Sequence, residues 1–277
     1  MNSLQKNSGI LINGQFDANL PVIDRGLAYG DGVYRTFVVR QGTPLLWAMQ
    51  YQKLLHDAQQ LNLNICPAEQ LLHEIQLLSA DSVQCVIKVI ITRGEGGRGY
   101  AIPANCMENR ILILSEYPQY AEHILEHGAK IFLCELRLSH QPKLAGIKHL
   151  NRLENVLARS ECKLIEFQDG LLLDQNDNVV ECTSGNIFAR FGNQLITPKL
   201  HDCGVAGVVR DWIIQQSHQW SLETQESMLT LSQLEQADEV LMTNSVIGAM
   251  NISQLNNITW HHNTLAKQIR KALGISA

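Results

Sequence analysis

Leu144-Ala145-Gly146-Ile147-Lys148-His149-Leu150-Asn151-Arg152-Leu153-Glu154 is the stretch around which this 277-residue chain is organised. Lys148 follows a small, flexible tripeptide. Asn151 and Glu154 have the spacing of a helix capping box, and apolar residues then recur at helical intervals as far as Gln168. These apolar residues are Leu153, Val156, Leu157, Leu164 and Ile165. We therefore expect Lys148 just ahead of a helix N-terminus, where the helix dipole disfavours an ammonium.

A lysine that loses its proton easily can react with an aldehyde or act as a base. On local sequence alone, a surface lysine in a loop is the commoner outcome. The function of Lys148 therefore has to be argued from the rest of the chain.

Composition excludes several classes of protein. The formal net charge is -5 with no basic block, so we expect no nucleic-acid partner. No apolar run approaches the ~20 residues that span a membrane, and residues 1–8 lack the apolar core of a signal peptide. The seven cysteines are scattered and include no Cys-x-x-Cys pair, which predicts a reducing, cytoplasmic location. The histidines form no H-x-x-x-H or H-E-x-x-H pattern, and we expect no metal site.

The predicted elements indicate a mixed α+β (α/β) fold with two domains. Residues 1–118 form the smaller N-terminal α+β domain, with strands at 9–14, 33–40, 85–91 and 111–114 and helices at 47–61 and 68–78. Residues 119–129 are the predicted linker. Residues 130–277 form the larger C-terminal domain, with strands at 130–138, 171–174, 178–182, 187–191, 194–197 and 239–243 and helices at 207–216 and 265–273.

Two segments of the predicted C-terminal domain suit a ligand site. Glu181 ends a strand and precedes Cys182-Thr183-Ser184-Gly185-Asn186, small residues that let backbone approach a ligand, although a solvent-exposed hairpin carboxylate fits as well. Gly207-Val208-Val209 enters a helix whose first-turn amides could bind an anion, although glycine also enters helices for packing reasons. Thr243-Asn244-Ser245, at a strand end, offers hydroxyls and amides for the same anion.

Two segments of the predicted N-terminal domain suit a substrate. Arg93, Arg98 and Tyr100 cluster on a glycine-rich loop, where two guanidinium groups could grip carboxylates, or could simply be exposed. Tyr34 and Thr36 are alternate residues of one strand and face the same side, although Tyr34 also fits core packing.

Taken together, these stretches resemble the fold type IV pyridoxal-phosphate enzymes, the group of branched-chain and D-amino-acid aminotransferases. The resemblance runs over nearly the whole chain and rests on four segments: residues 29–36, 92–100, 144–154 and 180–188. Within this group, the R-G-x-G-G-R-G-Y loop and L-A-G-I-K-H-L-N-R-L-E resemble the 4-amino-4-deoxychorismate lyases. The resemblance implies a lyase that forms 4-aminobenzoate and pyruvate, a step toward folate.

The resemblance also implies roles for individual residues. Lys148 would bond covalently to pyridoxal 5'-phosphate and move the substrate proton, and Glu181 would hydrogen-bond the pyridine nitrogen. Thr36 would supply a hydroxyl near the reacting ring. The phosphate would bind at Gly207, Val208, Val209, Asn244 and Ser245. The substrate would contact Tyr34, Arg93, Arg98 and Tyr100.

One position departs from the pattern of the group. The first long helix usually shows H-x-x-R-L, and here it reads Gln50-Tyr51-Gln52-Lys53-Leu54. Lys53 keeps the charge for a phosphate contact but cannot bind bidentately. The resemblance further implies a homodimer. The alternatives are a D-amino-acid or branched-chain aminotransferase of the same fold and a non-catalytic cofactor-binding protein.

Overall fold

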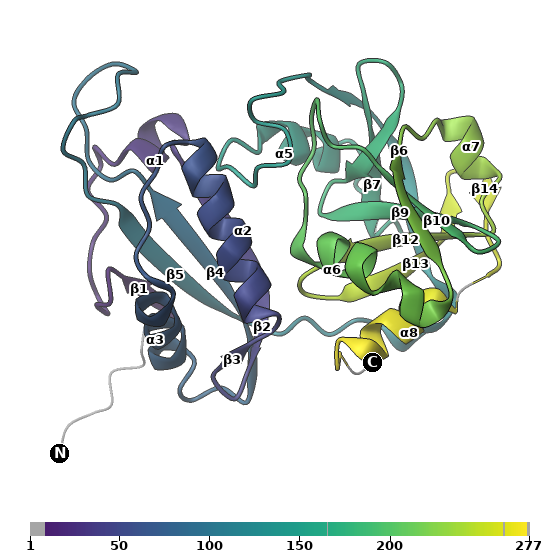
Figure 1. Ribbon diagram of the computed structural model, residues 1–277, viewed down its shortest axis with the longest axis horizontal. Helices are drawn as coiled ribbons and strands as arrows, with labels where there is room; N and C mark the ends of the chain where they lie inside the picture. The colour runs from purple at the N-terminus through teal and green to yellow at the C-terminus, as the bar shows by residue number, and fades with distance from the viewer. Residues whose placement is uncertain (1–8, 165, 263, 276–277) are drawn as a thin grey trace. The chain divides into compact units, whose positions relative to one another are not determined.

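The computed structural model describes residues 9–164, 166–262 and 264–275, and its chain divides into two compact units (Figure 1). Unit 1 comprises the chain up to Pro118 together with Lys148–Asn151. Unit 2 comprises Gln119–Ile147 and the chain from Arg152 onward. The lysine-centred tetrapeptide thus belongs to the first unit, although it lies far beyond residue 118 in the sequence.

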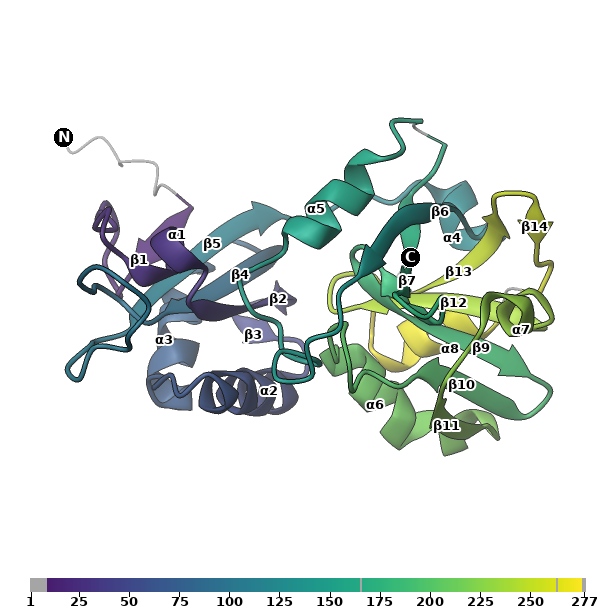
Figure 2. The ribbon, with the colours of Figure 1, turned by 90° about the horizontal axis from the view of Figure 1, so that it is seen from above.

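Unit 1 is a five-stranded antiparallel sheet with two longer helices on one face (Figure 2). The strand order is β1-β5-β4-β2-β3, with β1 Ile10–Ile12, β2 Gly32–Arg40, β3 Thr43–Pro44, β4 Gln84–Thr92 and β5 Asn109–Glu116. The helices are α1 Arg25–Tyr29, α2 Trp47–Gln60 and α3 Ala68–Leu78. α2 packs against β2, and α3 packs against β1 and β5.

The two faces of β2 differ in burial. Val33, Phe37 and Val39 are buried, whereas Tyr34 and Thr36 are half-buried. Alternate side chains of a strand point to opposite faces. Tyr34 and Thr36 therefore lie on the face away from α2.

Unit 2 is built on a mixed nine-stranded sheet whose central strands close into a ring. Strand pairing runs from β9 through β12, β13, β6, β7 and β8 and back to β9. β10 and β11 extend the sheet from β9, and β14 pairs with β13. The strands are β6 Ala129–Leu138, β7 Asp169–Asp174, β8 Val179–Cys182, β9 Gly185–Phe191, β10 Gln194–Pro198, β11 Glu223–Ser227, β12 Glu239–Asn244, β13 Gly248–Leu255 and β14 Ile258–Thr259.

One set of alternate residues from these strands forms the main hydrophobic core of unit 2. It includes Ile131, Leu171, Ile187, Val240 and Ile252, all almost fully buried. The helices of unit 2 are α4 Glu122–His127, α5 Leu153–Ser160, α6 Val208–Gln216, the 3-10 helix Ser217–Trp220, α7 Leu231–Glu235 and α8 Leu265–Ala272. α6 packs beside β12 and α8 beside β13.

The predicted helix after Asn151 is shorter than expected and starts differently. α5 ends at Ser160, and Arg152 rather than Asn151 is its N-cap residue, with no side-chain hydrogen bond to the first turn. The Asn151 side chain donates to the Gly30 carbonyl at 3.2 Å, and Glu154 accepts from the Ser139 amide at 2.9 Å. The predicted capping box is therefore wrong, and Ile165 of the predicted stripe lies outside the described residues.

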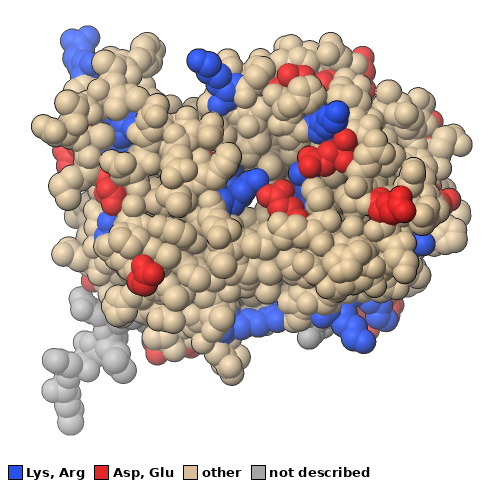
Figure 3. Space-filling model, viewed as in Figure 1, with Lys and Arg blue, Asp and Glu red and all other residues tan. Residues whose placement is uncertain are grey.

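On the face drawn in Figure 3, basic and acidic groups are interspersed among other residues, so charges of one sign do not dominate it. Within the described ranges, no helix has the length and apolar character that crossing a membrane requires.

Candidate functional site

The backbone around Lys148 is bound to the start of β2. The Tyr34 amide donates to the Lys148 carbonyl at 3.0 Å, and the Leu150 amide donates to the Gly32 carbonyl at 3.0 Å. Lys148 Nζ lies 4.5 Å from the centroid of the Tyr34 ring. Two residues predicted from separate motifs, Lys148 and Tyr34, are thus brought together within unit 1. Lys148 precedes α5 by five residues, so the predicted effect of the helix dipole does not apply.

A second lysine approaches the same ring. Lys88 Nζ, on β4, lies 4.8 Å from the Tyr34 centroid, and Lys88 pairs with Thr36 across the strands. Cross-strand partners point to the same face, so Lys88, Tyr34 and Thr36 share the half-buried face of the sheet. Lys88 was not selected as a candidate from the sequence. The available signal was a lone lysine within an otherwise apolar strand.

Arg93 is occupied by the protein itself. Its side chain is 3% exposed, and it donates to both oxygens of Asp31 and to the carbonyls of Leu61 and Asn62 at 2.7–2.9 Å. Every guanidinium nitrogen therefore has a protein partner. The predicted role of Arg93 as a substrate clamp has no support in this geometry, and its contacts instead fix the start of the glycine-rich loop.

The rest of this loop is held by Arg25. Arg25 donates to Asp31 at 2.9 Å and to the carbonyls of Gly99 and Tyr100 at 3.1 and 3.3 Å. The Tyr100 ring stacks edge-on against Tyr29, with centroids 5.5 Å apart. Tyr100 and Arg98 remain exposed and can contact a ligand.

Asp31 joins the two arginines. Burial raises the pKa of the Asp31 carboxyl, but the hydrogen bonds and charges of Arg93 and Arg25 lower it more, so the pKa lies below its usual value. Asp31 is therefore ionised at neutral pH and keeps both guanidinium groups in place.

In unit 2, Glu181 is a buried carboxylate with a backbone donor. Glu181 lies on β8, is 3% exposed, and its Oε2 accepts the Val205 amide at 2.8 Å. The Val205 loop is held in turn by Asn186, whose side chain donates to the Val205 carbonyl at 2.6 Å and accepts the Gly207 amide at 3.0 Å. The nitrogen and the oxygen of the Asn186 side-chain amide thus both hold the loop that leads into α6.

The predicted anion site lies at the N-terminus of α6. Gly207 is the N-cap residue and makes no side-chain cap, so the first-turn amides, those of Val208 and Val209 among them, have no intrahelical acceptor. A Cβ at Gly207 would meet Asn186 Oδ1 at 2.4 Å, so any other residue there would displace the Asn186 side chain from its hydrogen bond to the Gly207 amide. Beside α6, Thr243 Oγ1 at the end of β12 is buried and has no hydrogen-bond partner among the described residues.

Asn244 has a structural role next to this threonine. Its Oδ1 accepts the amides of Val246 and Ile247 at 2.9 and 3.0 Å, and its Nδ2 donates to the Ser184 carbonyl at 3.2 Å. These bonds fix the turn after β12, and Ser245 is half-buried in that turn. Asn244 therefore shapes the predicted anion site through the backbone.

The turn after Glu181 depends on Asp169, a residue that the sequence analysis did not select. Asp169 is 1% exposed and accepts from the Thr183 amide at 3.0 Å and from the hydroxyls of Thr183 and Ser184. Its location fourteen residues from Thr183, at the start of the neighbouring strand β7, gave no local signal.

Two backbone hydrogen bonds connect Gly146, in the stretch before Lys148, to the Val205 loop within unit 2. The Gly146 amide donates to the Gly204 carbonyl at 2.9 Å, and the Ala206 amide donates to the Gly146 carbonyl at 3.0 Å. Gly146 therefore pairs with the loop that binds Glu181, and it lies two residues before Lys148 in the chain.

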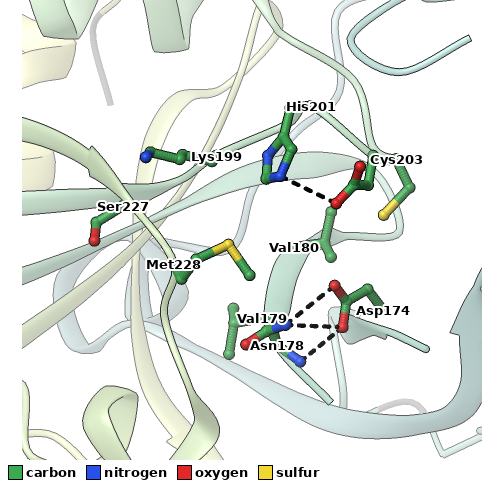
Figure 4. Close-up of a pocket in the computed structure, with 10 residues that line it drawn as sticks. Asp174, Asn178, Val179, Val180, Lys199, His201, Cys203, Ser227 and Met228 are labelled. Carbon is green, nitrogen blue, oxygen red and sulfur yellow. Dashed lines mark hydrogen bonds and ion pairs between the residues drawn. The ribbon is translucent and has the colours of Figure 1, made fainter. Parts of the chain in front are cut away.

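A pocket lined by Asp174, Asn178, His201, Asp202 and Cys203, among other residues, is a poor candidate for catalysis (Figure 4). His201 pairs with Asp202 at 3.0 Å, and Asp174 accepts from the backbone and side chain of Asn178. Burial, and then neighbouring carboxylates, raise the pKa of the Cys203 thiol to about 12, so it is no nucleophile at neutral pH. In the part of the chain that the structure describes, no three His, Cys, Asp or Glu side chains are grouped to hold a metal ion.

Comparison with known proteins gives a consistent result. The family model described as Amino-transferase class IV matches residues 32–255. An aminodeoxychorismate lyase from Vibrio harveyi is 32% identical over 88% of this chain and 90% of its own. The crystal structure of 4-amino-4-deoxychorismate lyase from Pseudomonas aeruginosa is 37% identical, with a TM-score of 0.90 over 95% of this chain and 97% of its own. A D-alanine aminotransferase from Listeria monocytogenes is 24% identical over 90% of this chain and 88% of its own.

Proposed function

The chain belongs to the Amino-transferase class IV family, and from this premise we propose that it converts 4-amino-4-deoxychorismate to 4-aminobenzoate and pyruvate with pyridoxal 5'-phosphate. Its fold is that of the fold type IV pyridoxal-phosphate enzymes. The observation that carries the proposal is the similarity, over 95% of the chain, to a solved lyase of this name.

The residues of unit 2 fit the cofactor. A buried carboxylate at Glu181 suits a protonated ring nitrogen. The uncapped N-terminus of α6 and the unpartnered hydroxyl of Thr243 suit a phosphate group. Asn244 and Ser245 would complete this phosphate site from the turn after β12, and a phosphate contact by Lys53 stays a prediction from the sequence. When bound, pyridoxal 5'-phosphate supplies an electron sink for the substrate carbon that carries the amine.

Lys148 would carry the cofactor covalently and then transfer protons. With its side chain free, Lys148 would remove the proton from the amine-bearing ring carbon through Nζ. The electron pair of the broken carbon–hydrogen bond would form a ring double bond to the neighbouring carbon. The carbon–oxygen bond from that carbon to the three-carbon side chain would break, and the ring would become aromatic. Lys148 then returns a proton to the departing group, which becomes pyruvate. Thr36, on the half-buried face of β2, would supply a hydroxyl near the reacting ring.

The substrate of this reaction carries two carboxylates, and basic residues of unit 1 suit them. Lys88 lies beside Tyr34 on the same sheet face, and Arg98 lies on the exposed loop next to Tyr100. Because the nitrogens of Arg93 are already bound, we assign carboxylate binding to Lys88 and Arg98. Arg93 would keep the loop in position.

We further propose a cytoplasmic homodimer. Leu153, Val156 and Leu157 form an apolar stripe on α5 and are 74%, 60% and 57% exposed. Exposed apolar patches of this kind mark interfaces. The seven cysteines, all free, suit a reducing compartment.

Steady-state assays separate this proposal from the aminotransferase alternative, which the D-alanine aminotransferase relative favours. The purified protein loaded with pyridoxal 5'-phosphate should release pyruvate and 4-aminobenzoate from 4-amino-4-deoxychorismate without any amino acceptor. Lys148→Ala should lower the rate by at least about 10³-fold, because it removes both attachment and proton transfer. Turnover that requires a 2-oxo acid would support amino transfer and overturn the lyase.

A further inference from the structure

Arg35 and Asp57 form a buried ion pair that no step of the proposed reaction uses. Arg35 lies on β2 and is 2% exposed, and Asp57 lies on α2 and is 1% exposed. Arg35 Nη2 donates to Asp57 Oδ2. Removing two charges from water costs free energy unless both are well paired. This cost indicates that the Arg35–Asp57 pair does more than attach α2 to β2.

The same Asp57 oxygen binds the peptide of Lys148. Asp57 Oδ2 accepts the backbone amide of Lys148 at 3.0 Å, across 91 residues of sequence. The carbonyl of Lys148 accepts the Tyr34 amide at 3.0 Å. The backbone amide and the backbone carbonyl of Lys148 are therefore both held by unit 1, the amide by α2 and the carbonyl by β2.

This arrangement separates the backbone of Lys148 from its side chain. The bonds to Asp57 and Tyr34 do not involve Nζ, so they persist whether Nζ is bonded to a cofactor or free. A lysine that is displaced and must return in every turnover needs a fixed origin for its side chain. A misplacement of about 1 Å can cost roughly 10²-fold in rate.

We propose that Asp57 is the positioning residue of Lys148, and that Arg35 holds the Asp57 carboxyl group in place as the acceptor for the Lys148 amide. The proposal deepens the function assigned above and rests on the role of Lys148 in it. It requires nothing of the substrate, because the contact is made by the protein alone.

A second carboxylate–arginine pair in unit 1 provides a matched control. Glu74 on α3 accepts from Nε and Nη2 of Arg110 at 3.1 and 2.9 Å, and the two side chains are 5% and 12% exposed. None of its hydrogen bonds involves residues 148–151. Glu74→Gln therefore removes a comparable charge pair without touching the lysine.

The first experiment is amide hydrogen exchange on the cofactor-free protein. Asp57→Asn keeps the shape but replaces a charged acceptor by a neutral one, and Asp57→Leu removes the acceptor. We expect exchange at the Lys148 amide to become about tenfold faster in Asp57→Asn, and faster still in Asp57→Leu. Glu74→Gln should leave this amide unchanged after correction for global stability. Equal exchange in all four proteins would overturn the proposal.

The second experiment measures turnover. Asp57→Asn should lower kcat by about 10- to 100-fold while KM changes less than about twofold, because the substrate contacts remain. The yield of cofactor trapped on Lys148 by borohydride should fall in parallel. A kcat equal to that of Glu74→Gln would assign Asp57 a structural role only and overturn the positioning role. If Lys148→Ala stays active, the proposed function fails, whereas the exchange result at residue 148 is unaffected.

Discussion

The two units fix their candidate residues by different chemistry. In unit 1, buried carboxylates and guanidinium groups do so: Asp57 with Arg35 at the lysine, and Asp31 with Arg93 and Arg25 at the glycine-rich loop. In unit 2, the Asp169 carboxylate holds the turn after Glu181, whereas the loop that leads into α6 is held by the neutral side-chain amide of Asn186. Asn186 fixes the Val205 loop, and the Val205 amide binds Glu181.

This difference has a physical consequence. A carboxylate–guanidinium pair changes its energy when the carboxylate takes up a proton, whereas an amide side chain does not titrate. The ion pairs of unit 1 should therefore depend on pH, and the two hydrogen bonds of the Asn186 side chain should not. Mutations on the two sides can test this contrast.

The largest effect on stability is expected for Arg93→Met. The change removes one partner of a buried pair and leaves the Leu61 and Asn62 carbonyls without their donor. We expect the free energy of unfolding to fall by about 3 kcal/mol, the lower end for a broken buried pair, because Asp31 keeps Arg25. Urea denaturation measures it. Arg137→Met, whose partner Asp177 is exposed, is the control and should cost less than about 1 kcal/mol. Similar losses in both variants would contradict the importance of burial.

A smaller effect is expected for Asn186→Ala. The Val205 carbonyl and the Gly207 amide would lose their partner in a buried loop, at a cost of about 2 kcal/mol. The affinity for pyridoxal 5'-phosphate should fall as well, because Glu181 and α6 are joined through this loop. The loss should be the same at pH 5.5 and pH 8, and a pH-dependent loss would remove the contrast between the units. Asn193→Ala, at an exposed turn, serves as the control.

The smallest effect is the pH dependence of Asp31. Its pKa is lowered in the folded protein, so its ionisation stabilises the fold above the ordinary aspartate pKa of about 3.9. This contribution is lost as the pH falls through the lowered value. Asp31→Asn should therefore reduce stability by about 1 kcal/mol at pH 7, with a gap to the unmutated protein that narrows as the pH falls below about 3.9. Thermal melts between pH 3 and pH 7 measure this gap. A gap that stays constant over that range would count against the two ion pairs.

Elements with clear periodicity were predictable from the sequence. The helix at 68–78 and the hairpin around Gln175-Asn176-Asp177 form as predicted, because apolar period and turn residues agree there. β13 was missed because its residues are buried on both faces and do not alternate. α1 was not among the predicted helices, because its segment is interrupted by glycines. The missed signal was Asp24, whose side chain caps the first turn by accepting the amides of Gly26 and Leu27.

The apolar stripe after Lys148 shows a limit of periodicity. Leu153, Val156 and Leu157 do recur at helical spacing, but they are exposed, and Ala158 is the buried residue of α5. An apolar stripe indicates that a helix face is to be buried, but it does not indicate which surface packs against that face.

The candidate site was partly predictable for a similar reason. Lys148, Glu181 and Gly207 belong to local motifs, whereas their supports lie far away in sequence. Asp57 is 91 residues from Lys148, and Asp31 is 62 residues from Arg93. Contacts at such separations depend on the packing of the sheet and leave no local pattern.

The pairing of Gly146 with the Val205 loop has a consequence for substitutions in the two loops. Its two hydrogen bonds join main-chain atoms only, so they do not depend on the identity of any side chain. A substitution at Ala145, or any substitution except proline at Ala206, leaves both hydrogen bonds available. The register between the two loops therefore depends on the course of the backbone and not on the side chains that the loops carry.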